Sequence, residues 1–274
     1  MSSGKGYTEF YGQNVKEMPK LLAAGKVPGS VADIAVRRLK GEDYFIDNYF
    51  DTSDLLAYDS KKRSDKVKFI LSVDNKGNIT EKGREALELI HYDNLLTSDY
   101  GIKLGNEIYD SLKGDEIIEV SRNELGKLGQ NLIHKERLNS KTWRILMRHP
   151  DEVPKEFAQN EGLLKDYSSW IDKKTRDTKN MGVYISNQTD DAKLKAWYLN
   201  RTVSRSNAYA RSDLDNDNGR FVEFSGGAAD KKFEKDLESK LGKDILSAIS
   251  SGIAFEHNGF LYIPTTAKNI KLNK

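Results

Sequence analysis

The first candidates for chemistry in this chain are three acidic residues in its last third. Asp213, Asp215 and Asp217 alternate as the first ligands of an EF-hand calcium loop do. Such a loop needs Gly at its sixth position and a bidentate Glu at its twelfth, where this chain has Asn218 and Phe224. The stretch therefore predicts a turn between two strands rather than a metal site.

Catalytic chemistry has little support elsewhere in the sequence. No metal-ligand spacing relates the four histidines, His91, His134, His149 and His257. The absence of Cys excludes disulfides, thiol catalysis and zinc ribbons. No Gly-rich phosphate loop follows a strand, and no Gly-x-Ser-x-Gly element is present. We therefore expect a protein that is not an enzyme and that binds no metal or cofactor.

The stretch from Ala196 to Val222 indicates recognition rather than catalysis. The chain has 31 Lys, 18 Glu, 4 Gln and 4 Met, yet these 27 consecutive positions contain none of them. One explanation is a pair of strands and a turn, because strands disfavour Lys and Glu while Asn, Asp, Ser and Gly form turns. The other explanation is mutagenesis directed at adenines in the gene. Randomising both adenines of an AAY codon, where Y is C or T, yields every amino acid except Lys, Glu, Gln, Met and Trp. Apart from Trp197, the stretch holds only residues of that set.

The residue types in this stretch are those that dominate recognition surfaces. Tyr198 and Tyr209 are expected to be rigid aromatic anchors, and three arginines are expected to be forked hydrogen-bond donors, namely Arg201, Arg205 and Arg211. Adaptable polar contacts are expected from Asn200, Ser204, Ser206, Asn207, Asp213, Asp215, Asn216, Asp217 and Asn218. Because Trp197 lies outside the permitted codon set, we predict that it is buried scaffold, together with Trp143 and Phe221.

The overall composition is that of a globular protein with a sizeable core. Of 274 residues, 31% are charged and 37% are apolar, and the net charge is +2. Charges of both signs are interspersed, so no basic tract points to nucleic acid or to an anionic membrane. No apolar run at the N-terminus resembles a signal peptide, and none approaches membrane-spanning length. We expect synthesis in the cytoplasm, no membrane insertion, and display on a virion or cell surface only by another route.

The first half of the chain offers elements but no motif of its own. We interpret residues 1–65 as an N-terminal extension with one helix at 31–39, capped by Ser30. The main domain, 66–274, begins with two short strands within 67–80. Helices are then predicted at 81–91, capped by Thr80, and at 99–112, and a strand at 116–120.

The capping box Ser121–Glu124 is followed by apolar residues at helical spacing, Leu125, Leu128, Leu132 and Ile133. A second helix is predicted at 141–149, capped by Asn139 or Ser140. This segment, VSRNELGKLGQNLIHKERLNSKTWRILMRH, resembles the C-type lectin fold of the formylglycine-generating-enzyme type. Arg137-Leu138 and Trp143 occupy matching places, whereas Asn139 stands where that family has Pro. Two helices and a short connector also fit a helix-turn-helix from Glu124 to Met147 that binds nucleic acid.

The closing part of the chain carries a second resemblance. After a helix at 162–173 come strands at 181–187 and 194–200, a Ser/Arg/Asn-rich connection, an acidic turn and NGRFVEFS. This order resembles the closing sheet of C-type lectin-like domains, especially the archaeal variable proteins of diversity-generating retroelements. The resemblance implies a rigid platform whose variable residues form the ligand-binding face. The calcium signatures of lectins, Glu-Pro-Asn and Trp-Asn-Asp, are absent.

Together these observations predict an α+β, C-type lectin-like domain with an N-terminal extension and, after the variable segment 196–222, a C-terminal helix at 228–251 and a hairpin on Asn258-Gly259. The predicted function is non-enzymatic binding of variable protein or cell-surface ligands. Two alternatives remain open at this point: a nucleic-acid-associated helix-turn-helix protein and a viral structural protein that assembles through residues 1–65. The sequence does not specify an oligomeric state.

Overall fold

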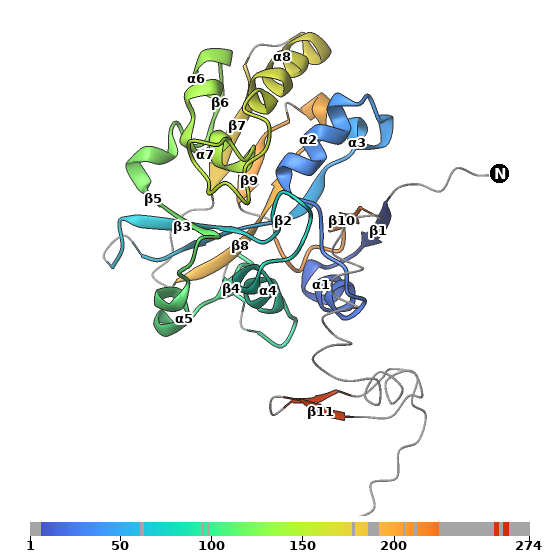
Figure 1. Ribbon diagram of the computed structural model, residues 1–274, viewed down its shortest axis with the longest axis vertical. Coiled ribbons are helices and arrows are strands. Elements are labelled where there is room, and N and C mark those ends of the chain that lie inside the picture. Colours follow the sequence, from blue (N-terminus) through green and yellow to red (C-terminus); the bar gives the residue numbers. More distant parts are fainter. Residues whose placement is uncertain are drawn as a thin grey trace, which may run out of the picture. The chain divides into compact units, whose positions relative to one another are not determined.

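The described part of the chain alternates short helices with strands (Figure 1). In this computed structural model it comprises residues 7–224 apart from 61–62, 95, 98, 177–178, 186–191, 205 and 211–212, together with 255–257 and 260–262. The helices are α1 (Asn14–Ala23), α2 (Val31–Leu39), α3 (Asp43–Asp47), α4 (Glu81–Glu88), α5 (Asn106–Ser111), α6 (His134–Asn139), α7 (Lys141–Leu146) and α8 (Leu163–Thr175). The strands are β1 (Thr8–Tyr11), β2 (Phe50–Tyr58), β3 (Lys66–Leu71), β4 (Ile102–Lys103), β5 (Ile117–Ser121), β6 (Gln130–Leu132), β7 (Asn180–Ile185), β8 (Lys193–Leu199), β9 (Ala208–Ala210), β10 (Arg220–Glu223), β11 (Phe255–His257) and β12 (Phe260–Tyr262).

One large sheet organises the described residues. Its strands follow the order β5-β3-β2-β8-β9-β7-β6, and β4 pairs with the first residues of β8. All of these pairings are antiparallel except that of β7 with β9, which is parallel. A separate two-stranded sheet joins β1 to β10. The stretch 196–222 therefore supplies β9 and most of β8 to the large sheet and most of β10 to the small one.

The sheet has a hydrophobic core on each face over the strands β2, β3 and β8. Neighbouring residues of one strand belong to different cores, as Leu55 and Leu56 of β2 do, because alternate side chains of a strand point to opposite faces. Residues of α2, α7 and α8 complete the core that contains Leu56 and Trp197. Residues of α1, α4 and α5 complete the core that contains Leu55 and Ala196. Figure 1 shows these two groups of helices on opposite sides of β2, β3 and β8.

The predicted N-terminal extension, residues 1–65, contains one strand of the large sheet. β2 lies between β3 and β8, and every position of β2 is buried. The chain divides instead into Met1–Gly227 and Ala228–Lys274. In the second unit β11 and β12 pair antiparallel as the predicted hairpin requires, whereas the predicted helix at 228–251 lies outside the described residues.

Several local predictions are confirmed. α2 begins after Ser30, whose side chain forms the capping box with Asp33, and Thr80 caps α4 by accepting from the amide of Gly83. The hydroxyl of Ser140 accepts from the amide of Trp143 at the start of α7. The predicted strands at 181–187 and 194–200 correspond to β7 and β8, and the predicted helix at 162–173 corresponds to α8.

Two predicted helices are wrong, and glycines explain both. In place of a helix from Leu125 to Ile133 the chain forms a 3-10 turn and the strand β6, because Gly126 and Gly129 adopt φ of 84° and 72°. In place of a helix over 99–112 the chain forms β4 and then the short α5. There a Cβ on Gly101 would lie 3.0 Å from the carbonyl oxygen of Leu194, so the backbone passes close to β8. The helix-turn-helix hypothesis thereby loses its first helix.

Candidate functional site

Three tyrosine rings stack across neighbouring strands at the end of the large sheet. Tyr198 of β8 lies opposite Tyr209 of β9, and their ring centroids are 4.6 Å apart with the planes at 5°. Tyr209 in turn lies beside Tyr184 of β7, with centroids 4.7 Å apart and planes at 15°. All three side chains are half-buried. We call these residues the tyrosine stack.

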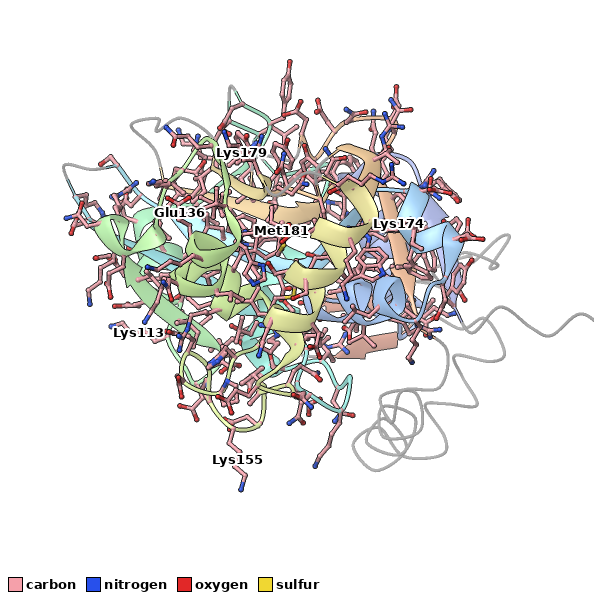
Figure 2. The ribbon with its side chains drawn as sticks, turned by 90° about the horizontal axis from the view of Figure 1, so that it is seen from above. Lys113, Glu136, Lys155, Lys174, Lys179 and Met181 are labelled. Atoms are coloured by element: carbon pink, nitrogen blue, oxygen red, sulfur yellow. The ribbon has the colours of Figure 1, made fainter. Side chains whose placement is uncertain are left out.

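The opposite face of the same strands is packed into the core. Five residues that alternate with the tyrosines are fully buried there, namely Val183, Trp197, Leu199, Ala208 and Ala210, and Ile185 is partly buried against the same core. Trp197 stacks on Phe69 with ring centroids 5.6 Å apart. Figure 2 shows α8 crossing this region, with Met181 labelled beside it. The side chains that alternate with the tyrosines fix the strand positions, so the tyrosine stack stands on a rigid base.

The predicted scaffold residues are confirmed as buried. Trp143, Trp197 and Phe221 are each 0% exposed. The indole nitrogen of Trp143 donates to the carbonyl of Met181 in β7, which ties α7 to the strand of Tyr184. The exclusion of Trp from the permitted codon set therefore identified a core position correctly.

The loop that follows β8 alternates exposed and buried residues. Arg201 is exposed and Val203 is 71% exposed, whereas Thr202 between them is 1% exposed. Asn200 is half-buried at the start of the loop. Val203 was not among the predicted contact residues, because these were all polar or aromatic.

Two predicted contact residues are not on the surface. Ser206 is 0% exposed and Asn207 is 4% exposed, so the prediction that they touch a ligand directly is wrong. Their side chains bond within the protein because the loop turns inward before β9. Arg205 and Arg211 lie outside the described residues, as does the side chain of Ser204.

The acidic stretch forms the predicted turn before β10. The amide of Asn216 donates to the carbonyl of Asp213, and the amide of Gly219 donates to that of Asn216. Asp213, Asn216, Asp217 and Asn218 are exposed, and Asp215 is half-buried. The carboxylate of Asp217 accepts from the side chain of Gln13 at 2.8 Å. In the residues described, no group of three His, Asp or Glu side chains could hold a metal ion.

The turn and the tyrosine stack are connected through β2. Asp51 lies opposite Tyr198 in the pairing of β2 with β8. Its carboxylate accepts from the amide of Arg220, the first residue of β10, at 2.9 Å. The structure thus brings Tyr198 and Tyr209 into contact and joins the acidic turn to them through one buried residue.

Two buried lysines lie on β8 before the tyrosine stack. Lys193 and Lys195 are both 0% exposed in their side chains, and Lys193 bonds the Asp99 carboxylate at 2.7 Å. Burial lowers the pKa of Lys195 to about 8, and the charge of Asp99 opposes that shift. Asp213 opposes it as well, so the acidic turn contributes to the electrostatic environment of β8.

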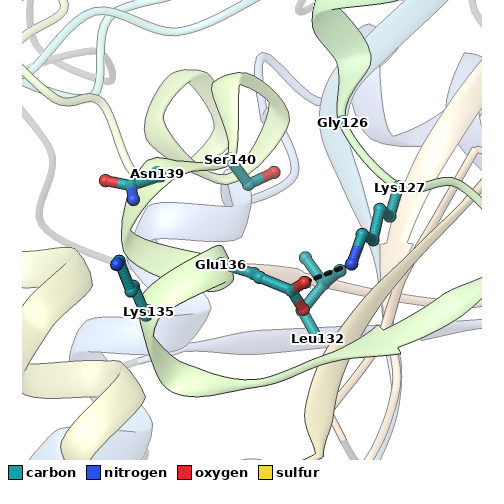
Figure 3. A pocket seen from close by; sticks show the side chains of 7 residues that line it. All are labelled: Gly126, Lys127, Leu132, Lys135, Glu136, Asn139 and Ser140. Atoms are coloured by element: carbon teal, nitrogen blue, oxygen red, sulfur yellow. Dashed lines mark hydrogen bonds and ion pairs between the residues drawn. The ribbon is translucent and has the colours of Figure 1, made fainter.

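Two cavities among the described residues lie away from the tyrosine stack. One of about 260 Å³ is lined by Gly126, Lys127, Leu132, Lys135, Glu136, Asn139 and Ser140 (Figure 3). Lys127 and Glu136 form an ion pair there, and Lys135 adds a second positive charge to the lining. A second cavity of about 330 Å³ lies between α5 and the strands β3 and β5, and it is similarly mixed in charge.

The arrangement of one twisted sheet, two helical layers and a terminal two-stranded pairing defines a known fold. A solved structure described as showing the accommodation of massive sequence variation in Nanoarchaeota by the C-type lectin fold is similar to this chain, with a TM-score of 0.54. The match covers 81% of this chain and 99% of that chain at 11% sequence identity. The chain has a C-type lectin fold, of the α+β class.

No family model matches the chain, and no curated protein matches it significantly. The likeness to the solved structure therefore establishes the fold alone. No helix in the described ranges is both long and apolar enough to cross a membrane.

Proposed function

We propose that this chain is a non-enzymatic binding protein whose ligand-recognition surface is the tyrosine stack together with the exposed residues Arg201 and Val203 of the adjoining loop. The observation that carries the proposal is the half-buried stack itself, built on strands whose other face is core. Stacked tyrosines offer a large contact area at low entropy cost, and they recur as anchors of recognition surfaces. The ligand class that such a surface suits is a protein or another cell-surface molecule.

We further propose that this surface is diversified by adenine-directed mutagenesis. The stretch 196–222 lacks Lys, Glu, Gln and Met, and its one Trp is buried scaffold. The solved structure with the same fold is described in terms of massive sequence variation, which supports this reading without establishing it. In this proposal the protein is displayed on a virion or a cell surface, where variation of its ligand is useful.

Deep sequencing of the gene across its source population tests the proposal. We expect substitutions to concentrate between codons 198 and 218, at adenines of a near-identical template repeat. Codons 183 and 197, whose side chains are buried, serve as internal controls and are expected to stay constant. Uniformly low variation across codons 198 to 218 would refute diversification. The absence of Lys and Glu would then be explained by the ordinary composition of strands and turns.

A further inference from the structure

Arg38 of α2 is a fully buried cation whose hydrogen bonds all go to neutral groups. Its Nε donates to the carbonyl of Phe45 at 2.7 Å, and its Nη2 donates to the carbonyls of Asn48 and Asn200 at 2.9 and 2.8 Å. Its Nη1 donates to the hydroxyls of Tyr167 and Ser206 at 2.8 and 2.9 Å. A guanidinium has five N–H donors, so every one of them is used.

These bonds hold both ends of the loop that carries Arg201 and Val203. Asn200 precedes that loop and Ser206 ends it, and Arg38 bonds one atom of each. The amide of Asn200 also donates to the carbonyl of Asn207, and the amide of Ser206 donates to that of Arg201. The contact at Asn200 uses a backbone oxygen, so it survives any side chain at that position.

The contact at position 206 depends on the side chain. The Ser206 hydroxyl lies 2.5 Å from that of Tyr167 in α8, and it completes a triangle with Arg38. Ser206 adopts φ of 48°, a left-handed conformation that is uncommon for residues other than Gly, Asn and Asp. A buried arginine donor left without an acceptor is costly, so a residue at position 206 that supplies no acceptor to Arg38 is expected to be unfavourable.

Asn207 is fixed in a similar way. Its side-chain oxygen accepts from the amide of Gly182 in β7 at 2.6 Å, and its side-chain nitrogen donates to the Tyr209 hydroxyl at 3.1 Å. The backbone of β7 at Gly182 also lies close to the tyrosine stack, because a Cβ on Gly182 would lie 2.8 Å from the ring of Tyr184. Asn207 therefore joins β7 to β9 directly beneath the tyrosine stack.

We propose that Arg38, with Tyr167, is a positioning residue that holds the ends of the recognition loop, and that Ser206 and Asn207 are fixed positions inside the diversified segment. This inference rests on the proposed function and deepens it, because it separates the codons that can vary from those that cannot. Variation is then confined to positions such as 198, 201, 203 and 209, whose side chains reach the surface.

The first test needs no ligand and no natural variation. A library of the full chain is randomised at codons 201, 203, 206 and 207, displayed on yeast and selected for resistance to protease. We expect positions 201 and 203 to accept nearly all residues, and positions 206 and 207 to return predominantly Ser and Asn. Equal tolerance at all four positions would overturn the inference, whereas the population sequencing above decides the proposed function independently.

The second test separates positioning from general stability by amide hydrogen exchange. Tyr167→Phe removes only the hydroxyl of the triangle, and we expect the amides of Asn200 and Ser206 to exchange roughly tenfold faster or more. Leu87→Ala, a cavity in the other core, is the control that lowers global stability, and it is expected to leave the rates of those two amides unchanged. If Tyr167→Phe accelerates them no more than Leu87→Ala does, Arg38 and Tyr167 do not position the loop.

Discussion

The strands β2 and β9 belong to the same sheet, yet they differ in what covers them. β2 is buried at every position, with helices α2, α7 and α8 completing the core on one face and α1, α4 and α5 on the other. In β9 the two alanines are buried and Tyr209 between them is only half-buried. The same contrast holds within β8, where Tyr198 alone is not fully buried.

Under the proposed function, this difference would separate stability from recognition. Where both faces are covered, each side chain contributes to packing, and a change of volume is felt in the free energy of unfolding. Where one face is open, the side chains on it can be exchanged while those behind it maintain the strand. The alternation of a strand thus places the two roles on neighbouring residues.

The largest effect is expected at Trp197. We predict that Trp197→Ala lowers the free energy of unfolding by about 3–5 kcal/mol, because it removes a fully buried indole that stacks on Phe69. Urea denaturation followed by circular dichroism measures the loss. Tyr198→Ala, one residue away, is the matched control and is expected to cost only about 1 kcal/mol. Comparable losses at the two positions would mean that the open face of β8 also supports the fold.

A smaller effect is expected from the buried lysine of β8. The pKa of Lys195 is lowered from 10.5 to about 8 in the folded chain, so the folded state loses its proton before the unfolded state does. Between these pH values the unfolded state binds more protons, and this residue therefore adds to stability as the pH rises from about 8 to about 10.5. With about 1.4 kcal/mol for each pKa unit, the expected gain is on the order of 3 kcal/mol.

The comparison of Lys195→Met with the wild type checks this pH dependence. We expect the difference in stability between the two proteins to change across this pH window, as followed by denaturation at successive pH values. Lys40→Met, at an exposed position, is the control and is expected to show no such change. A constant difference between Lys195→Met and the wild type would show that Lys195 titrates normally.

The sequence predicted local structure well where caps and periodicity were clear. Ser30 and Thr80 located the starts of α2 and α4, and the codon argument located Trp197 in the core. The fold class followed from short motifs around Trp143 and along β8. These features depend on residues close together in the chain, so they can be recognised without coordinates.

Features that depend on distant partners could not be predicted. β2 contains Asp51 and Asp54, which argue against a buried strand until their partners are known. Asp54 pairs with the buried Arg148, although burial still raises the pKa of this carboxyl. Tyr184 lies outside the stretch 196–222 and joins the proposed site only through strand pairing. Arg38 was missed for the same reason, since its partners are up to 168 positions away.

The smallest effect is expected at Val203, and it tests where the scaffold ends and the proposed recognition surface begins. Val203→Asp is predicted to change the free energy of unfolding by no more than about 0.5 kcal/mol, because the side chain is 71% exposed. Thr202→Asp at the preceding position is the matched control. It is expected to be strongly destabilising, because it places the same carboxylate where the native side chain is 1% exposed.

Thermal denaturation of these two variants measures how narrow that boundary is. If Val203→Asp alone retains the melting temperature of the wild type, one residue separates a position that the fold requires from one that it leaves to recognition. If both variants are tolerated, the 3-10 turn Thr202–Ser204 rearranges to expose either side chain, and the loop is held less firmly than the bonds of Arg38 imply. If both are strongly destabilising, Val203 is part of the scaffold and cannot belong to a diversified surface.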